Sequence, residues 1–331
     1  MQDVSSYTKA GYLNHIVLLH LLGNEVHVAT IRGDIDTLTR LVRTESLDLP
    51  GRSFQSALHA AADIGCQTTV AWLLEQGAEM NHIQGNPLQA AVERGHDEVV
   101  RLLLDAGANA NLATGEYGGT LPTAIFLERL VIVDLLTKKD PTLFRQRSAY
   151  GSALDIAACR KNNNTRMLVT LVRAGADVAQ GGPDNGSPID GAVICGYQGN
   201  VRTLLELGFP CEQGLKLAIQ RKKFGIARLI LDFEPTSLER ITTGQWSPLI
   251  CAAQNDDYRM VLLILRKVRP TFRSALLERT ETWRGLTPLD CARRAGLRKI
   301  ARLLEATLEH KDAVQIIYRS KRNKVSGDDL V

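Results

Sequence analysis

The chain has 331 residues, of which 44% are hydrophobic and 23% are charged. No stretch reaches the roughly 18 to 20 apolar residues that cross a bilayer, and no basic start precedes the short apolar segment at residues 16–22, so we expect a cytoplasmic protein without a membrane span. The net charge of +4 is unevenly divided: residues 1–199 carry 16 Lys/Arg and 21 Asp/Glu, whereas residues 200–331 carry 24 and 15.

A repeat of about 33 residues runs through most of the sequence. One apolar residue of each repeat serves as a landmark, and successive landmarks are 32, 30, 33, 33, 35, 26, 34 and 40 residues apart. The landmarks are Val26, Leu58, Leu88, Leu121, Leu154, Ile189, Leu215, Leu249 and Leu289. Three residues after each landmark stands an alanine: Ala29, Ala61, Ala91, Ala124, Ala157, Ala192, Ala218, Ala252 and Ala292. Chance does not place nine alanines at one repeat position, so the period marks structural units.

Each repeat carries the signals of two short helices. Two residues before the landmark, most repeats have Ser, Thr or Asn, whose side chains accept from the free N–H groups of a helix start. Proline follows in four repeats, at the first helical position where no N–H donor is needed. Glycine seven residues after the landmark predicts a left-handed turn at the end of the first helix. A second apolar run, such as residues 99–104, then predicts a second helix.

The repeated alanine has a steric explanation. If each first helix lies between its neighbours in a stack, a side chain larger than methyl would overpack the contact at a cost of about 1–3 kcal/mol. One helix pair cannot bury its apolar face alone, whereas stacked pairs share a continuous core. The sequence therefore predicts an all-α solenoid of about nine helix–loop–helix units.

Three segments carry a family signature. Residues 58–61 (Leu-His-Ala-Ala), 87–91 (Pro-Leu-Gln-Ala-Ala) and 287–292 (Thr-Pro-Leu-Asp-Cys-Ala) resemble the ankyrin repeat, whose signature is Thr-Pro-Leu-His-x-Ala on a 33-residue period. The resemblance covers residues 24–305. It implies short hairpin fingers along one edge and protein binding through the fingers and the concave helix face.

The finger segments 115–119 and 149–154 are similar to those of ankyrin arrays common in filamentous fungi. In many of those proteins the array follows a nucleotide-binding domain. The phosphate-binding pattern G-x-x-x-x-G-K-S/T does not occur in this sequence, so we expect no such domain here.

The pattern is interrupted at defined places along the chain. We expect a capping helix at residues 1–23, the repeat array at 24–305, a second capping helix at 306–318 and a disordered tail, basic then acidic, at 319–331. Within the array we expect a truncated finger near 208–215 and an enlarged linker near 266–283. Four polar residues replace the glycine that ends the first helix: Glu128, Lys161, Lys222 and Asp256.

No residue pattern in the sequence indicates catalysis or a cofactor. There is no H-E-x-x-H, no Ser–His–Asp order and no CxxC pair among the six cysteines. His27 and His59 occupy the histidine position of the repeat signature, where the resemblance implies structural hydrogen bonds. We therefore expect no enzyme, no metal and no cofactor.

Aromatic and basic residues near the fingers are the candidates for binding a partner. Phe54, Tyr117 and Tyr150 each lie four residues before a landmark, and Trp246 and Trp283 lie three and six before theirs. Interfaces favour Trp, Tyr and Arg as energetic centres, although the tyrosines also fit packing between fingers. The basic residues proposed to surround these aromatics are Arg266, Lys267 and Arg269.

The most direct interpretation is a monomeric protein–protein interaction scaffold or adaptor that binds another protein. One alternative is an enzyme whose site was built secondarily on the array. Another is a nuclear regulator whose basic C-terminal half binds nucleic acid or acidic partners, which a steep salt dependence would reveal. The basic run at residues 319–324 leaves a nuclear location open as well.

Overall fold

The structure is a computed structural model that describes residues 19, 22–81, 85–113, 115–145, 148–161, 164–177, 186–241, 246–278 and 285–309. The capping helix expected at 1–23 lies almost wholly outside this range, as do the tail and Trp283. Of the capping helix expected at 306–318, residues 306–309 are described, and they continue the last helix of the array.

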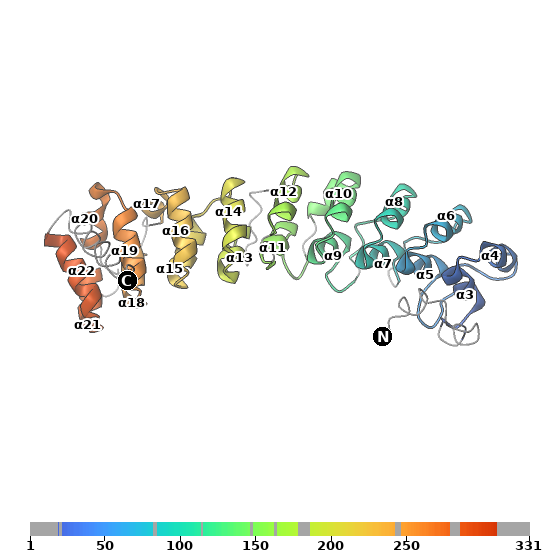
Figure 1. Cartoon of the computed structure of the whole chain (residues 1–331), viewed down its shortest axis with the longest axis horizontal. Coiled ribbons are helices and arrows are strands. Elements are labelled where there is room, and N and C mark those ends of the chain that lie inside the picture. Colours follow the sequence, from blue (N-terminus) through green and yellow to red (C-terminus); the bar gives the residue numbers. More distant parts are fainter. Residues whose placement is uncertain are drawn as a thin grey trace, which may run out of the picture. The chain divides into compact units, whose positions relative to one another are not determined.

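Nine helix pairs form in the described residues, one for each landmark (Figure 1). The first helices are α3 (Glu25–Arg32), α5 (Ala57–Ile64), α7 (Pro87–Arg94), α9 (Thr120–Phe126), α11 (Ala153–Ala158), α13 (Pro188–Cys195), α15 (Glu212–Gln220), α18 (Pro248–Gln254) and α21 (Pro288–Arg294). The second helices are α4 (Ile35–Leu41), α6 (Gln67–Glu75), α8 (Asp97–Asp105), α10 (Leu130–Lys139), α12 (Thr165–Arg173), α14 (Gln198–Glu206), α16 (Phe224–Phe233), α19 (Tyr258–Lys267) and α22 (Arg298–Glu309). The prediction of an all-α solenoid is confirmed.

Three further elements lie between these pairs. They are the 3-10 helix η1 (Pro141–Arg145) and the helices α17 (Ser237–Arg240) and α20 (Pro270–Glu278). Helix α20 occupies much of the segment expected to be an enlarged linker. Only residues 207–211 separate α14 from α15, whereas residues 106–119 separate α8 from α9.

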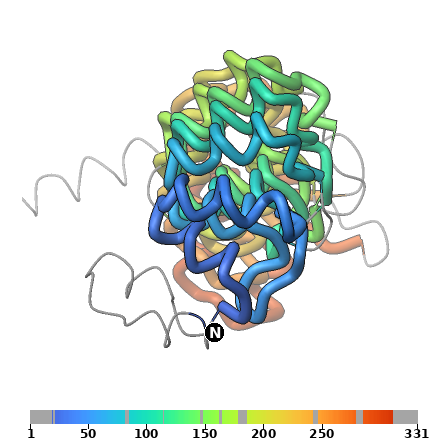
Figure 2. Tube along the Cα trace, turned by 90° about the vertical axis from the view of Figure 1, so that its right-hand side faces the viewer, coloured from blue at the N-terminus to red at the C-terminus, as the bar shows by residue number. Residues whose placement is uncertain are grey.

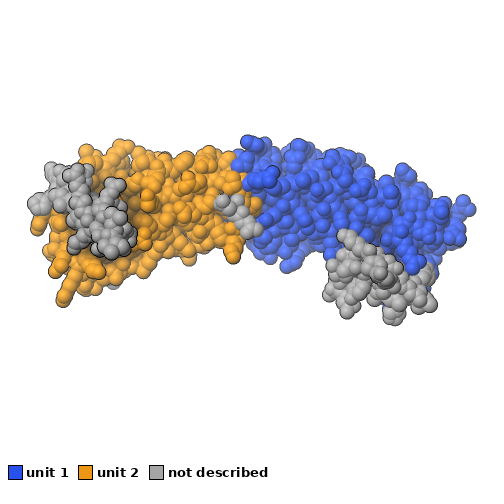
Figure 3. All heavy atoms as spheres, in the orientation of Figure 1, with its two compact units in different colours: residues 1–160, 166–180 blue, residues 161–165, 181–331 orange. Residues whose placement is uncertain are grey.

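The chain divides into two compact units, residues 1–160 with 166–180 and residues 161–165 with 181–331 (Figure 3). In unit 1 each first helix packs on the next, from α3 through α5, α7 and α9 to α11, and the second helices α6, α8 and α10 do the same. Unit 2 repeats this arrangement in the series α13, α15, α18, α21 and the series α14, α16, α19, α22. Figure 2 shows how successive pairs of unit 1 follow the same outline.

The nine alanines that stand three residues after the landmarks all lie on first helices, which pack on one another within each unit. All are buried, and eight of them have no exposed surface at all. Their helices begin as the sequence predicts: Asn24, Ser56, Asn86, Ser152, Ser187, Ser247 and Thr287 are N-caps. The seventh repeat departs from the pattern, because α15 is capped by Cys211 after its shortened connection.

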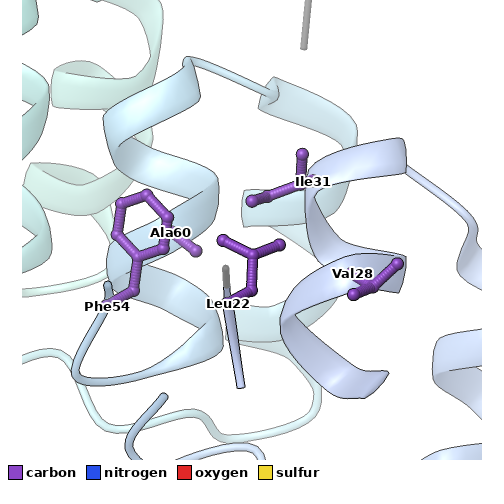
Figure 4. Packing of buried hydrophobic residues seen from close by; sticks show 5 residues of the cluster. All are labelled: Leu22, Val28, Ile31, Phe54 and Ala60. Carbon is purple, nitrogen blue, oxygen red and sulfur yellow. The ribbon is translucent and has the colours of Figure 1, made fainter. Parts of the chain in front are cut away.

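The first hydrophobic cluster shows how one repeat packs on the next (Figure 4). Leu22, Val28 and Ile31 meet Phe54 and Ala60 of the following repeat. Phe54 is only 6% exposed, and its ring stacks on His27 and meets His59 edge-on. Phe54 therefore belongs to the core, and we remove it from the candidate binding residues.

Three polar residues hold the left-handed conformation that glycine holds in other repeats. Glu128, Lys222 and Asp256 have φ of 58°, 56° and 51°, and Gly33, Gly65 and Gly95 fill the corresponding turn with φ of 68°, 83° and 79°. A side chain with a Cβ is strained in this region by roughly 1–2 kcal/mol. The chain therefore stores strain at the ends of α9, α15 and α18.

Replacing Lys222 by glycine is expected to stabilise the protein by about 1 kcal/mol, because it removes this strain at an exposed position. The adjacent Arg221→Gly is the matched control, since Arg221 has a φ of −95° and gains nothing from glycine. Equilibrium unfolding in urea measures both changes. Equal effects of the two substitutions would contradict the assignment of strain to residue 222.

Candidate functional site

A tight turn forms the finger that precedes α11. Ser148 and Gly151 exchange two backbone N–H···O=C bonds of 3.1 Å each, which leaves Ala149 and Tyr150 at the tip. Gly151 has φ of 99°, a conformation that this reversal needs and that glycine adopts without strain. The turn holds the Tyr150 side chain out in solvent, where 49% of it is exposed.

The neighbouring finger packs directly against this turn. A Cβ added to Gly118 would lie 3.4 Å from the Cβ of Ser148, so the two fingers are in contact. Tyr117 in the first of these fingers lies with its ring centroid 6.1 Å from that of Tyr150. The two tyrosines lie side by side, as expected from their equal distance in sequence to their landmarks.

Phe126, the last residue of α9, completes an aromatic cluster with the tyrosines. Its ring stacks on Tyr117 with centroids 4.1 Å apart and planes 21° apart. It also lies 5.7 Å from Tyr150. Offset stacked and tilted pairs at these distances attract one another beyond simple burial. We call Tyr117, Phe126, Tyr150 and Arg160 the finger cluster.

Arg160 supplies the charged member of the finger cluster. Its guanidinium carbon lies 4.4 Å from the centroid of the Phe126 ring, within the range of a cation–π contact. The same guanidinium lies 4.0 Å from a carboxylate oxygen of Glu128. The cluster therefore joins two adjacent repeats of unit 1 and combines aromatic, cationic and anionic groups.

Sequence reasoning missed Phe126 and Arg160. Phe126 lies five residues after its landmark, a position that holds Asp63, Glu93 and Cys159 in neighbouring repeats, so no repeat pattern marks it. That variability is itself a signal, because a position with no shared packing role is free to serve binding. Arg160 was not expected either, since it and Lys161 form only a two-residue basic pair at the end of a first helix.

Trp246 lies in unit 2, just before Ser247, the N-cap of α18. Its side chain is half-buried, and the Lys216 ammonium on α15 lies 5.5 Å from the centroid of its ring. Trp246 and Lys216 therefore repeat, in two successive repeats of unit 2, the pairing of an aromatic ring with a cation. Trp283 lies outside the described residues.

The three basic candidates lie on other elements than Trp246, which precedes α18. Arg266 and Lys267 occupy the end of α19, a second helix, and Lys267 forms an ion pair with Asp232 on α16. Arg269 precedes α20 and lies 3.3 Å from Glu239 of α17. They were expected to surround the finger aromatics, but Arg266 and Lys267 instead line a groove between second helices.

Within the described residues, no three His, Cys, Asp or Glu side chains are grouped to hold a metal ion. The six cysteines are free thiols. No helix of that part of the chain is both long and apolar enough to span a bilayer.

Comparison with known proteins identifies the repeat. Residues 26–114 match the family model for ankyrin repeats in three copies. The B-cell lymphoma 3 protein homolog of Mus musculus is 30% identical over 142 residues, which are 41% of this chain and 29% of that protein. Ankyrin repeat and SOCS box protein 16 of Homo sapiens is 30% identical over 200 residues, or 56% of this chain and 43% of that protein. The chain thus spans less than half the length of these relatives.

A solved structure supports the same fold. The crystal structure of the ankyrin repeat domain of Bcl-3, described there as a unique member of the IkappaB protein family, superimposes with a TM-score of 0.52. The match covers 57% of this chain and 88% of that one at 24% identity. The chain therefore contains ankyrin repeats at residues 26–114 and has the fold of an ankyrin-repeat solenoid. Ankyrin-repeat domains generally act as non-enzymatic modules that bind other proteins.

Proposed function

We propose that this chain is a protein–protein interaction scaffold or adaptor whose partner docks on the fingers and on the adjoining first helices. In unit 1 the contact centres on the finger cluster. In unit 2 it centres on Trp246. The partner is another protein, and the chain itself acts as a monomer.

The observation that carries the proposal is the exposure of Tyr150 within the finger cluster. When a partner buries the exposed half of the tyrosine ring, the removal of apolar surface from water stabilises the complex by about 25 cal/mol per Å². The ring is already positioned by Tyr117 and Phe126, so a partner does not have to order it on binding. Tyr, Trp and Arg are the residues that most often dominate the energy of protein interfaces.

Site-specific photo-crosslinking tests the proposal and identifies the partner in the same experiment. Benzoylphenylalanine would replace Tyr150, and in a matched control it would replace Val131 at the start of α10, which is 53% exposed. Both chains would be irradiated in an extract of the source cells, and captured proteins identified by mass spectrometry. We expect a defined protein to be captured from position 150 and absent from position 131. The same proteins captured from both positions would contradict a finger-centred site.

A further inference from the structure

A groove of about 690 Å³ lies between α16 and α19 in unit 2. Both walls are second helices of successive repeats, whereas the fingers lead into first helices. On α16 the groove is lined by Phe224, Arg228 and Asp232, which are four residues apart and so share one face of the helix. The groove is therefore built from other elements than the fingers and first helices that form the proposed binding surface.

The floor of the groove is apolar. Leu263 is 8% exposed, and Leu262 and Phe224 are half-buried. An open groove with such a floor gains stability when an apolar side chain covers it. The apolar floor alone does not indicate which kind of molecule supplies this side chain. The charged residues around the floor do indicate it.

The rim of the groove carries four cations and one carboxylate. Arg228, Arg259, Arg266 and Lys267 line it together with Asp232. Asp232 lies 3.5 Å from Arg228 and forms an ion pair with Lys267 as well, so a single anion is shared by two cations. The Lys267 ammonium hydrogen-bonded to Asp232 lowers the pKa of that carboxyl. At neutral pH the rim has a net charge of +3.

One of the cations is already held in place. The guanidinium carbon of Arg259 lies 4.4 Å from the centroid of the Phe224 ring, which covers the face of the guanidinium. A stacked guanidinium still directs its N–H groups outward in its own plane, in the fork that matches a carboxylate. This geometry suits an incoming Asp or Glu side chain.

The corresponding groove in unit 1 has a different charge balance. The groove between α8 and α10 has about 210 Å³ and is lined by Arg101, Lys138 and Lys139 among others. Each of these cations has a carboxylate of its own at 2.6–3.3 Å, namely Glu98, Asp134 and Asp105 respectively. Counted over the lining residues alone, the groove of unit 1 carries three cations and Asp105, a net charge of +2, so the groove of unit 2 differs in its larger volume and in having one carboxylate that two of its cations share.

We propose that the groove between α16 and α19 is a second docking site, which binds a short acidic peptide segment of a partner protein with one apolar residue between carboxylates. The apolar residue covers Leu262 and Leu263, and the carboxylates pair with Arg228, Arg259 and Arg266. Helices of ten residues are about 15 Å long, which matches four or five residues of extended chain. A phosphate backbone would leave the apolar floor uncovered, so the chemistry favours a peptide over a nucleic acid.

The test uses a fluorescein-labelled peptide in which one Leu is flanked on each side by Asp and Glu, with fluorescence anisotropy of the full chain at physiological salt. Arg228→Gln/Arg266→Gln removes two charges from the groove. Arg101→Gln/Lys138→Gln removes two charges from the groove of unit 1 and is the matched control. We expect the first pair to weaken binding at least about tenfold and the control to stay within about twofold. Replacing this Leu by Gly in the peptide should also weaken binding severalfold.

Several results would overturn the proposal. Equal losses in the two double variants would mean that only net charge matters. No binding of the peptide, or tighter binding of a single-stranded oligo-dT that depends on Arg228 and Arg266, would exclude the acidic peptide. Circular dichroism and thermal melting confirm that each variant is folded. Crosslinking from position 150 does not involve this groove. Failure of the peptide experiment would therefore contradict the second docking site and leave the proposed function to be judged by the crosslinking result.

Discussion

Acidification from pH 6.5 to pH 4 is expected to lower the free energy of unfolding of unit 1 by about 3 kcal/mol, because it forces a proton onto a buried histidine. His27 has no exposed surface, and its ring Nδ1 is hydrogen-bonded to the N-cap Asn24. Burial lowers the pKa of His27 to about 4. Burial also lowers the pKa of His59 in the next repeat.

Stability falls on acidification because the pKa of His27 is lower in the folded state than in the unfolded state. In the unfolded chain His27 titrates near its ordinary pKa of about 6.5. Between pH 6.5 and 4 the unfolded state therefore binds more protons than the folded state, so stability is complete above this window and is lost within it. Hydrogen exchange of α3 and α5, followed as a function of pH, would show the loss directly.

His27→Gln isolates the contribution of this one ring. The third repeat already carries glutamine at the same position, Gln89, which is buried like His27. The variant is expected to lose most of the pH dependence between 6.5 and 4 that His27 causes, while the titration of carboxylates at lower pH remains. An NMR titration that gave His27 a pKa near 6.5 would refute this explanation.

Ala91→Leu is expected to destabilise the protein by about 2 kcal/mol through overpacking. Ala91 has no exposed surface and lies on α7, which packs against α5 on one side and α9 on the other. Its carbonyl accepts the two N–H bonds that end the helix, from Gly95 and His96 at 2.9 Å each. The backbone is therefore fixed at this point and cannot move aside for three additional carbons.

Ala275→Leu is the matched control for this substitution. Ala275 lies on α20 and is exposed, so the same change should alter the free energy of unfolding by less than about 0.5 kcal/mol. Urea unfolding of both variants gives the comparison. A cost at Ala91 as small as the cost at Ala275 would show that the repeated alanine has some cause other than the contact between first helices.

The fold was predictable because each repeat carries its own complete set of local signals. Ser56 caps α5, Pro87 begins α7 and Gly65 ends α5, and each acts within one turn of its own position. The start of the helix was harder to place in the seventh repeat: Gln213 stands two residues before Leu215, where most repeats have Ser, Thr or Asn, but the N-cap of α15 is Cys211. A shortened connection changes where a helix begins, and no local residue reports that shift.

The candidate site was less predictable, because it depends on which side chains meet across repeats. Tyr117 and Tyr150 were found from their shared distance to the landmark, a feature of the repeat itself. Phe54 has the same distance, yet it is buried against His27 and His59, two rings that the other fingers lack. Arg266 and Lys267 are close to Arg269 in sequence, but α19 ends at Lys267 and directs them toward α16 instead.

The affinity of the captured partner for variants of the finger cluster tests the central claim most directly. Isothermal titration would compare the parent chain with Tyr150→Ala, with Tyr117→Ala/Tyr150→Ala, and with Val131→Ala, a change at a similarly exposed position. We predict at least a tenfold loss for Tyr150→Ala, a larger loss for the double variant, and no change for Val131→Ala. Parental affinity in the double variant, with its helical circular dichroism retained, would contradict recognition through the fingers.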